Sequence, residues 1–430
     1  MTEHPYRDEE LGAALRELDV PEHAPGFFGR LERRAPAPRR RRRWSVAVAA
    51  AAVVAAVVAV AIGIPRGGTD VASAAEVQAR VQDSLETLRS LGGVFVYDGP
   101  AKGDEERWRF TMSADGGLRL VGPSPDEAIT YDPAAGVVRS AQRSASAGGK
   151  TIFYAERRGV APGPPDGGPP TSILPHEFGA YVRALLAARD PRVRETTYEG
   201  RPAWRLDADT VPNAIVPEFT GDRLELTVDR ETGLPVRVVE RKQGTFLREL
   251  RIEELALDAP LRPAAFRLVF PVGAEVLASD DGFRRVELGE VSGITGYAPL
   301  VPGWVPTGFE LAEVAVARQG SPTGVEGGNP PARMVVSLAY RRGFDRFLVT
   351  TRLAGRGQWS DPLARGEGFR DEPEQVPLGE GALRGATAQL LIVPRGIPHL
   401  WALTDELVVT VGGDLGRDEL LRVAESLQRG

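Results

Sequence analysis

The spacing of apolar residues changes character several times along the chain. Residues 45–64 are apolar throughout, apart from Ser45 at their first position. From residue 75 a helical stripe begins, and its members are Val77, Val81, Leu85, Leu88 and Leu91. This spacing predicts a helix over 75–91 that the pair Gly92-Gly93 closes. Beyond it, apolar and polar residues alternate, which is the pattern of half-buried strands.

The alternating region predicts strands joined by short hairpins as far as residue 155. Trp108, Phe110 and Met112 fall on one face of a strand over 107–112. An Ala-Asp-Gly-Gly turn follows, and Leu118 and Leu120 continue the same face. The other strands expected in this part lie over 94–97, 128–131, 137–138 and 151–155.

A Pro/Gly-rich loop over 162–170 separates this part from a second helix and further strands. The helix is expected over 175–188, where Phe178, Tyr181 and Leu185 belong to one apolar stripe. Strands are expected over 194–197, 203–206, 223–228, 235–241 and 246–254. Strands that follow one another through short turns indicate an antiparallel meander, with the helices as an added layer.

A Gly/Pro-rich stretch over 297–303 precedes a third unit. Strands are expected there near 310–317, 334–341, 347–352, 388–393, 400–403 and 406–411, with a terminal helix over 417–427. We therefore expect a smaller C-terminal α+β domain over 300–430.

The apolar stretch at 45–64 has the length of a membrane-spanning helix, since about 20 apolar residues cross the hydrocarbon core. Arg39 to Arg43 precede it and only Arg66 follows closely. The excess of arginine predicts a cytoplasmic N-terminus in a single-pass protein of the cell membrane. We expect a cytoplasmic head over 1–43, a transmembrane helix over 44–64 and a linker over 65–74. The alternative is a cleaved signal peptide, because 72–74 reads Ala-Ser-Ala; the large region is exported in either case.

The head contains two short apolar groups, one around Leu11, Leu15 and Leu18 and one around Phe27 and Phe28. Groups this small cannot bury a core of their own. Residues 9–31 therefore either dock into the groove of a cytoplasmic partner or form a disordered tail that only sets the topology.

Composition excludes several classes of function. The 430 residues carry a net charge of −6, which argues against nucleic acid as the main partner. The chain has no cysteine, and none of its four histidines has a second histidine at ligand spacing. It also lacks a nucleophile elbow, a P-loop and an HExxH motif. We expect neither an enzyme nor a protein with a metal or a cofactor.

Several segments, taken in order, resemble the LolA and RseB-like group of exported lipid-binding proteins. They include Gly93 to Tyr97 after the first helix, the Trp-Arg-Phe strand at 108–110, the hairpin from Ile129 to Gly136, and Phe266 to Ala274. The hairpin Leu226-Thr227-Val228-Asp229 to Gly233-Leu234-Pro235-Val236-Arg237 matches the group well. The resemblance covers about 75–290. It implies a curved antiparallel half-barrel with helices on its concave side.

The resemblance also implies that the concave side binds lipid acyl chains or a lipoprotein. The side chains expected to line it are Trp108, Phe110, Met112, Leu118, Leu120, Ile129, Tyr131, Trp204, Leu224 and Leu226, with Phe178, Tyr181 and Leu185 as a lid. Burial of methylene groups would supply the binding energy. The alternative for each of these residues is an ordinary place in a packed core.

The C-terminal unit looks like the small domain at the end of bacterial anchored regulators, on the residues 300–311 and 418–427. The head is similar to those of actinobacterial membrane regulators associated with sigma factors. The leading hypothesis is a membrane-anchored extracytoplasmic lipid or lipoprotein sensor, with a sigma factor as one candidate partner of the head. The alternatives are an envelope lipid or lipoprotein carrier without signalling, and a structural, protein-binding β domain.

Overall fold

The computed structural model describes residues 72–99, 105–124, 127–143, 152–158, 191–209, 221–279, 283–319, 333–354, 373–392 and 397–430. The expected head and transmembrane helix lie outside these residues, as do most of the expected linker and the second helix expected over 175–188. None of the helices in the described part has the length and apolarity needed to cross a bilayer.

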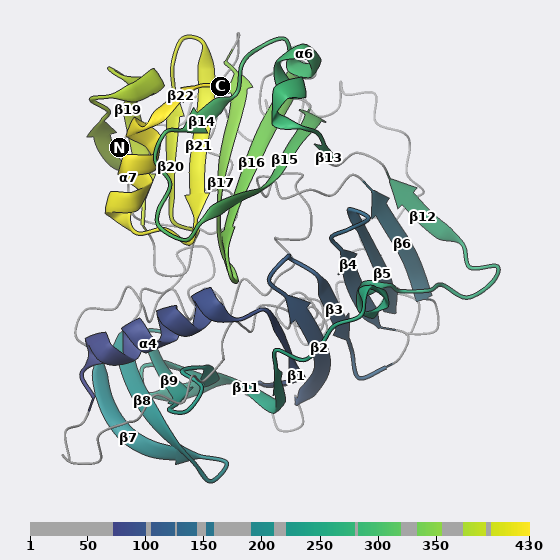
Figure 1. The fold of residues 1–430 in the computed structure, drawn as a ribbon. Helices are drawn as coiled ribbons and strands as arrows, with labels where there is room; N and C mark the ends of the chain where they lie inside the picture. The colour runs from purple at the N-terminus through teal and green to yellow at the C-terminus, as the bar shows by residue number, and fades with distance from the viewer. Residues whose placement is uncertain are drawn as a thin grey trace, which may run out of the picture. The chain divides into compact units, whose positions relative to one another are not determined.

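Twelve of the described strands form one open sheet, in the order β12-β6-β5-β4-β3-β2-β1-β11-β10-β9-β8-β7 (Figure 1). The strands are β1 (Ser90–Asp98), β2 (Glu106–Ser113), β3 (Leu118–Val121), β4 (Ala128–Asp132), β5 (Val137–Arg143), β6 (Ile152–Arg158), β7 (Arg192–Tyr198), β8 (Arg201–Asp209), β9 (Arg223–Asp229), β10 (Pro235–Lys242), β11 (Thr245–Leu257) and β12 (Val276–Ser279). The order shows two antiparallel meanders, β1 to β6 and β7 to β11, so the expectation of a meander is confirmed.

The two meanders join where β1 pairs with β11, and Phe95 lies opposite Ile252 at this seam. All neighbours in the sheet are antiparallel except β12, which runs parallel to β6. The sheet does not close into a barrel, because β7 and β12 are its two edges.

Two of the hairpins have turns that an aspartate shapes. The Asp229 carboxylate accepts hydrogen bonds from the backbone N–H groups of Glu231 and Thr232, at 3.0 and 2.9 Å. Gly233 follows with a φ of +71°, a value that glycine adopts without strain. Asp132 accepts from two backbone N–H groups in the same way, ahead of Gly136. These local interactions set the register of the β9–β10 and β4–β5 hairpins.

The first described helix, α4 (Ala74–Thr87), begins with a capping box in which Ser73 and Glu76 bond reciprocally. It ends four residues before the predicted end, because β1 already starts at Ser90 and pairs on both sides. The prediction that Gly92 and Gly93 close the helix is therefore wrong, because both residues belong to β1. A Cβ on Gly93 would lie 2.9 Å from a backbone oxygen of β11 and 3.2 Å from the Phe110 ring, so this strand position needs glycine.

The second sheet has eight strands in the order β13-β15-β16-β17-β21-β20-β19-β18. Their bounds are β13 (Arg284–Arg285), β15 (Glu310–Gln319), β16 (Arg333–Arg342), β17 (Asp345–Leu353), β18 (Glu374–Pro377), β19 (Thr387–Leu391), β20 (His399–Leu403) and β21 (Leu407–Gly413). Helices α6 (Val291–Thr295) and α7 (Arg417–Glu425) pack on it, and β14 (Leu300–Pro302) pairs with β22 (Leu427–Arg429). The expected terminal helix is α7. The described protein is thus mostly β-sheet with few helices.

Helix α4 also contacts the turn between β16 and β17. The backbone N–H of Phe344 donates to the Leu85 oxygen at 3.1 Å. Arg342 pairs with Glu86 at 2.9 Å, and Gln82 donates to the Asp345 carboxylate at 2.6 Å. These polar contacts connect α4 to the eight-stranded sheet.

Candidate functional site: the apolar face of the twelve-stranded sheet

Nine of the predicted lining residues lie in a single buried cluster. They are Trp108, Phe110, Met112, Leu118, Leu120, Ile129, Tyr131, Leu224 and Leu226. Each is at most 5% exposed, and Trp204 packs against the cluster while partly exposed. Phe178, Tyr181 and Leu185, expected to form the lid, lie outside the described residues. The structure therefore brings together the predicted residues that it describes.

The strand register shows that these side chains share one face of the sheet, which we call the apolar face. Across one meander, Met112 lies opposite Leu118, Leu118 opposite Tyr131, and Tyr131 opposite Val138. Across the other, a second row runs through Val193, Leu206, Leu226, Val238 and Leu250 on five successive strands. Since opposed residues in a ladder point to the same side, the apolar face continues from β7 to β5.

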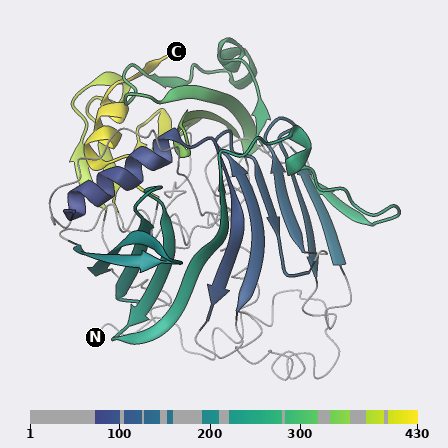
Figure 2. The same cartoon turned by 60° about the horizontal axis from the view of Figure 1, so that its bottom comes forward.

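Helix α4 covers only part of this face. Val77 and Val81 on the helix are fully buried against the cluster. Ser84 donates to the backbone oxygen of Thr232 at 2.9 Å, which fixes the helix to the β9–β10 turn. Figures 1 and 2 show α4 over the half of the sheet that contains β7 to β9, away from β2 to β6. The other described α-helices, α6 and α7, pack on the eight-stranded sheet.

Trp108 lies at the centre of the face, opposite Phe95 on β1, and is 4% exposed. Its indole Nε1 is buried and has no hydrogen-bond partner. Leaving such a donor unpaired costs about 1–3 kcal/mol. Trp204 on the same face and Trp401 on β20 share this property. A ligand oxygen at the apolar face would satisfy the indole of Trp108 or Trp204.

A buried charged pair lies on the apolar face. Glu240 lies opposite Leu224 and Arg248, and is 1% exposed. Arg248 Nε donates to its carboxylate at 2.6 Å, and the backbone N–H of Gly221 donates to the other oxygen. A buried carboxylate requires such partners. Residue type alone would assign Glu240 to solvent, because glutamate is usually exposed, whereas its spacing from Val236 and Val238 places it on the buried face.

The opposite face of the sheet is polar and carries arginine–carboxylate pairs. Arg237 binds Glu249 through two hydrogen bonds of 3.0 and 2.7 Å, and this hydrogen bonding raises the pKa of Arg237. Glu225 pairs with Arg205 at 2.9 Å and with Arg241 at 2.7 Å. Cross-strand pairs of opposite charge stabilise a sheet modestly. They also show that the two faces have different chemistry, and only one of them suits an apolar ligand.

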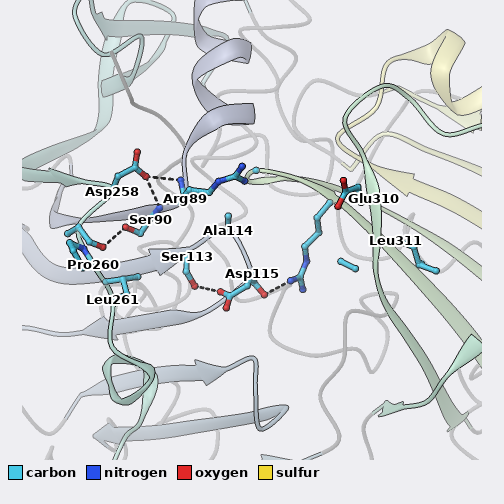
Figure 3. Close-up of a pocket in the computed structure, with 14 residues that line it drawn as sticks. Arg89, Ser90, Ser113, Ala114, Asp115, Asp258, Pro260, Leu261, Glu310 and Leu311 are labelled. Carbon is cyan, nitrogen blue, oxygen red and sulfur yellow. Dashed lines mark hydrogen bonds between the residues drawn. The ribbon is translucent and has the colours of Figure 1, made fainter. Parts of the chain in front are cut away.

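A separate pocket of about 640 Å³ lies between the start of β1, the β2–β3 turn and strands β15 and β16 (Figure 3). The Asp258 carboxylate accepts from the backbone N–H groups of Arg89 and Ser90, at 2.8 and 3.1 Å. Arg341 donates to the backbone oxygen of Asp115 on the facing wall. The pocket contains none of the predicted lining residues, and its charged walls do not suit acyl chains.

The fold and the site define a protein with an open antiparallel sheet, one face of which is apolar over most of its strands. No protein-family model and no curated protein matches the chain. Among solved structures, it is similar to the MucA/MucB complex of Pseudomonas aeruginosa, with 19% identity, 83% of this chain and 98% of that chain covered, and a TM-score of 0.29.

Two further structures cover about half of this chain. LprF from Mycobacterium bovis has 16% identity over 44% of this chain and 96% of its own, with a TM-score of 0.26. The LolA superfamily protein NE2245 from Nitrosomonas europaea has 8% identity over 46% and 98%, with a TM-score of 0.20. Because these TM-scores are low, the functional proposal rests on the geometry of this chain's own residues.

Proposed function

We propose that this protein is a membrane-anchored, extracytoplasmic sensor whose twelve-stranded sheet binds lipid acyl chains, either free in a lipid or attached to a lipoprotein. The observation that supports this most is the extent of the apolar face. It continues over both meanders, from Val193 on β7 to Val138 on β5. Helix α4 contributes Val77 and Val81 to the cluster and packs Leu85 against it. The two rows of side chains thus extend over far more strands than α4 covers.

The chemistry of the face agrees with an acyl ligand. Apart from Glu240 and Arg248, which pair with each other, the rows described above contain no charged side chain. Each methylene transferred from water to such a surface contributes about 0.8 kcal/mol. An ester or carboxyl oxygen next to Trp108 would accept the indole hydrogen bond. Neither interaction needs a catalytic group, and we propose binding rather than catalysis.

A filled β domain that binds other proteins is the competing candidate, and one observation favours it. Leu120 and Leu224 have no exposed surface, so their neighbours already pack around them. The two candidates differ in what the purified full-length chain contains. A ligand-binding protein copurifies with lipid and takes up a fluorescent fatty acid, whereas a filled domain does neither.

Uptake of the fluorescent fatty acid is best compared between two variants with the same added bulk. Ile129→Phe enlarges a side chain on the apolar face, and Leu390→Phe does so in the core of the eight-stranded sheet. Overpacking destabilises both by about 1–3 kcal/mol. We expect weaker uptake for Ile129→Phe only. Equal uptake by wild type and both variants, or none by wild type, would exclude acyl binding at this face.

The sensing role concerns the head, residues 9–31, for which we propose a cytoplasmic partner such as a sigma factor. Apolar groups around Leu15 and Phe27 are suited to a partner's groove. Deletion of residues 1–38 keeps the arginines and the expected anchor. If this deletion changes transcription of envelope genes, the result supports a sensing role. Unchanged transcription together with intact acyl binding would identify a tethered carrier instead.

A further inference from the structure

The register carries part of the apolar face beyond β5 to the edge of the sheet, although the row through Val138 meets Arg157 on β6. One row runs from Phe110 through Leu120 and Ile129. It then passes through Ser140 on β5 and Ala155 on β6 to Leu277 on β12. The exposed fraction rises along this row, through Ser140 and Ala155, which are both half-buried. Leu120 has no exposed surface, whereas Leu277 is 78% exposed. The face that is buried in the middle of the sheet therefore meets solvent at the β6–β12 edge.

Exposed apolar side chains are concentrated at this edge. Of the nine large hydrophobic residues that are exposed in the described part of the chain, five belong to β6, β12 or the segment just before β12: Phe153, Val269, Val272, Val276 and Leu277. Phe270 in this segment packs edge-on against Tyr154, with ring centroids 5.3 Å apart. That contact holds the segment to β6 and leaves its neighbours Val269 and Val272 fully or almost fully exposed. We call these residues the apolar rim.

Figure 2 shows where the apolar rim lies. The segment that leads into β12 projects beyond β6 at the side of the sheet remote from α4. Soluble proteins rarely expose several large apolar side chains on neighbouring segments, and such exposure marks binding to a protein or a membrane.

The charges around the apolar rim favour a membrane with anionic lipids. The two segments that form it, 152–158 and 262–279, contain four arginines and two glutamates, although the whole chain has a net charge of −6. Arg267, two residues before Val269, pairs with Asp132 at 3.5 Å and is still 61% exposed. Aliphatic side chains beside exposed arginines are the combination that inserts into the interface of anionic bilayers. A protein partner would instead need directional polar groups among the apolar ones.

We propose that the apolar rim docks on the surface of an anionic lipid bilayer and that acyl chains reach the apolar face there. This inference rests on the proposed function, because it supplies the route by which the ligand enters. A second copy of the chain is the other conceivable occupant. It is less suited, since β12 has only four residues and a short edge strand offers few backbone groups for pairing.

The absence of cysteine allows a direct test with the full-length chain. Val272→Cys and Leu403→Cys each introduce one thiol for an environment-sensitive fluorophore. Leu403 is another exposed apolar residue, at 42%, but lies on β20 of the other sheet. Each labelled protein is reconstituted into phosphatidylglycerol vesicles whose acyl chains carry bromine, which quenches a fluorophore only when it enters the bilayer.

We expect quenching and a blue shift for the label at 272 and neither for the label at 403. Replacing the anionic lipid with phosphatidylcholine should reduce the quenching at 272 several-fold, because the arginines lose their partners. Equal quenching at both positions overturns the proposal. So does an emission shift at 272 that needs only a higher protein concentration and no vesicles, which would identify a second copy as the partner.

A further experiment distinguishes an error in the docking proposal from an error in the proposed acyl binding. The double variant Val269→Asp/Val272→Asp should take up vesicle-borne fluorescent fatty acid at least tenfold more slowly than wild type. It should take up the same fatty acid at the normal rate from detergent micelles. If the double variant takes up fatty acid from vesicles at the wild-type rate, the proposed docking of the apolar rim on the bilayer is refuted. No uptake by wild type from either source refutes the proposed function, and the quenching at 272 still tests the rim.

Discussion

The buried carboxyl of Asp345 should make the stability of this protein depend on pH in a direction opposite to that of an ordinary surface aspartate. Its side chain is 6% exposed, and it accepts hydrogen bonds from Gln82 at 2.6 Å and from Arg342 at 3.1 Å. Burial, with a further contribution from the charge of Asp414, raises the pKa of Asp345 to about 8. Arg342 opposes this rise in the pKa of Asp345 without cancelling it, and the charge of Glu86 adds to the rise.

The direction of the pH dependence follows from the number of protons that the folded and the unfolded chain bind. In the unfolded chain the carboxyl has a pKa of about 4, so between about pH 4 and pH 8 the folded chain holds a proton that the unfolded chain has lost. The contribution of Asp345 to stability is therefore complete below pH 4 and is lost as the pH rises towards 8. The full difference corresponds to about 5 kcal/mol, which is an upper bound. Asn at this position keeps an oxygen for Gln82 and carries no charge at any pH.

The assay is thermal unfolding of full-length wild type and Asp345→Asn, followed by circular dichroism at pH 5 and pH 9. We expect melting temperatures within a few degrees of each other at pH 5, and a clearly higher value for the variant at pH 9. Asp418→Asn is the control, because the Asp418 side chain is 95% exposed, and it should not alter the difference between the two pH values. If Asp345→Asn lowered the melting temperature equally at both, the ion pair with Arg342 would dominate and the reasoning would be refuted.

Three further substitutions test the packing of the two sheets. Gly343→Ala should destabilise the folded state by more than 2 kcal/mol, since its Cβ would lie 2.3 Å from a backbone oxygen of α4. Gly200→Ala, also at positive φ but with open space around it, should cost only about 1 kcal/mol. Chemical denaturation compares the two variants, and equal losses of stability would refute the contact between Gly343 and α4. Glu240→Gln should cost about 3–5 kcal/mol in the same assay because it removes the carboxylate charge that Arg248 binds at 2.6 Å, and a loss under 1 kcal/mol would show that the pair is solvated. Phe110→Ala should cost about 3–5 kcal/mol in ligand-free protein if the apolar face is packed, and clearly less if ligand fills the space beside it.

The parts of the fold that the sequence predicts are those determined by neighbouring residues. The strand predicted over 107–112 is β2, and its partner β3 follows after an Asp-Gly turn. The turn at Asp229 forms as expected, because one carboxylate satisfies two backbone N–H groups within three residues. In both cases alternation and turn chemistry act over fewer than ten residues, a range that a single sequence displays fully.

The parts that the sequence does not reveal depend on contacts between distant residues. Pairing of Phe95 with Ile252 joins the two meanders across more than 150 positions, and no local pattern encodes it. The predicted helix is too long for a related reason. Leu88 and Leu91 continue its apolar stripe, yet Leu91 pairs with Met112 on β2 and Leu257 on β11. The strand pairings outweigh a helical preference that amounts to a fraction of a kcal/mol per residue.

The same limit explains why alternation predicts the lining residues but not their role. Leu120 and Leu277 have the same side chain, the same face and the same row of the sheet, yet one is fully buried and the other is mostly exposed. Their difference comes from which other segments lie over each end of the row, and a pattern of period two contains no information about that. The exposure of Leu277 on the edge strand β12 is therefore a property of the folded sheet and not of the local sequence.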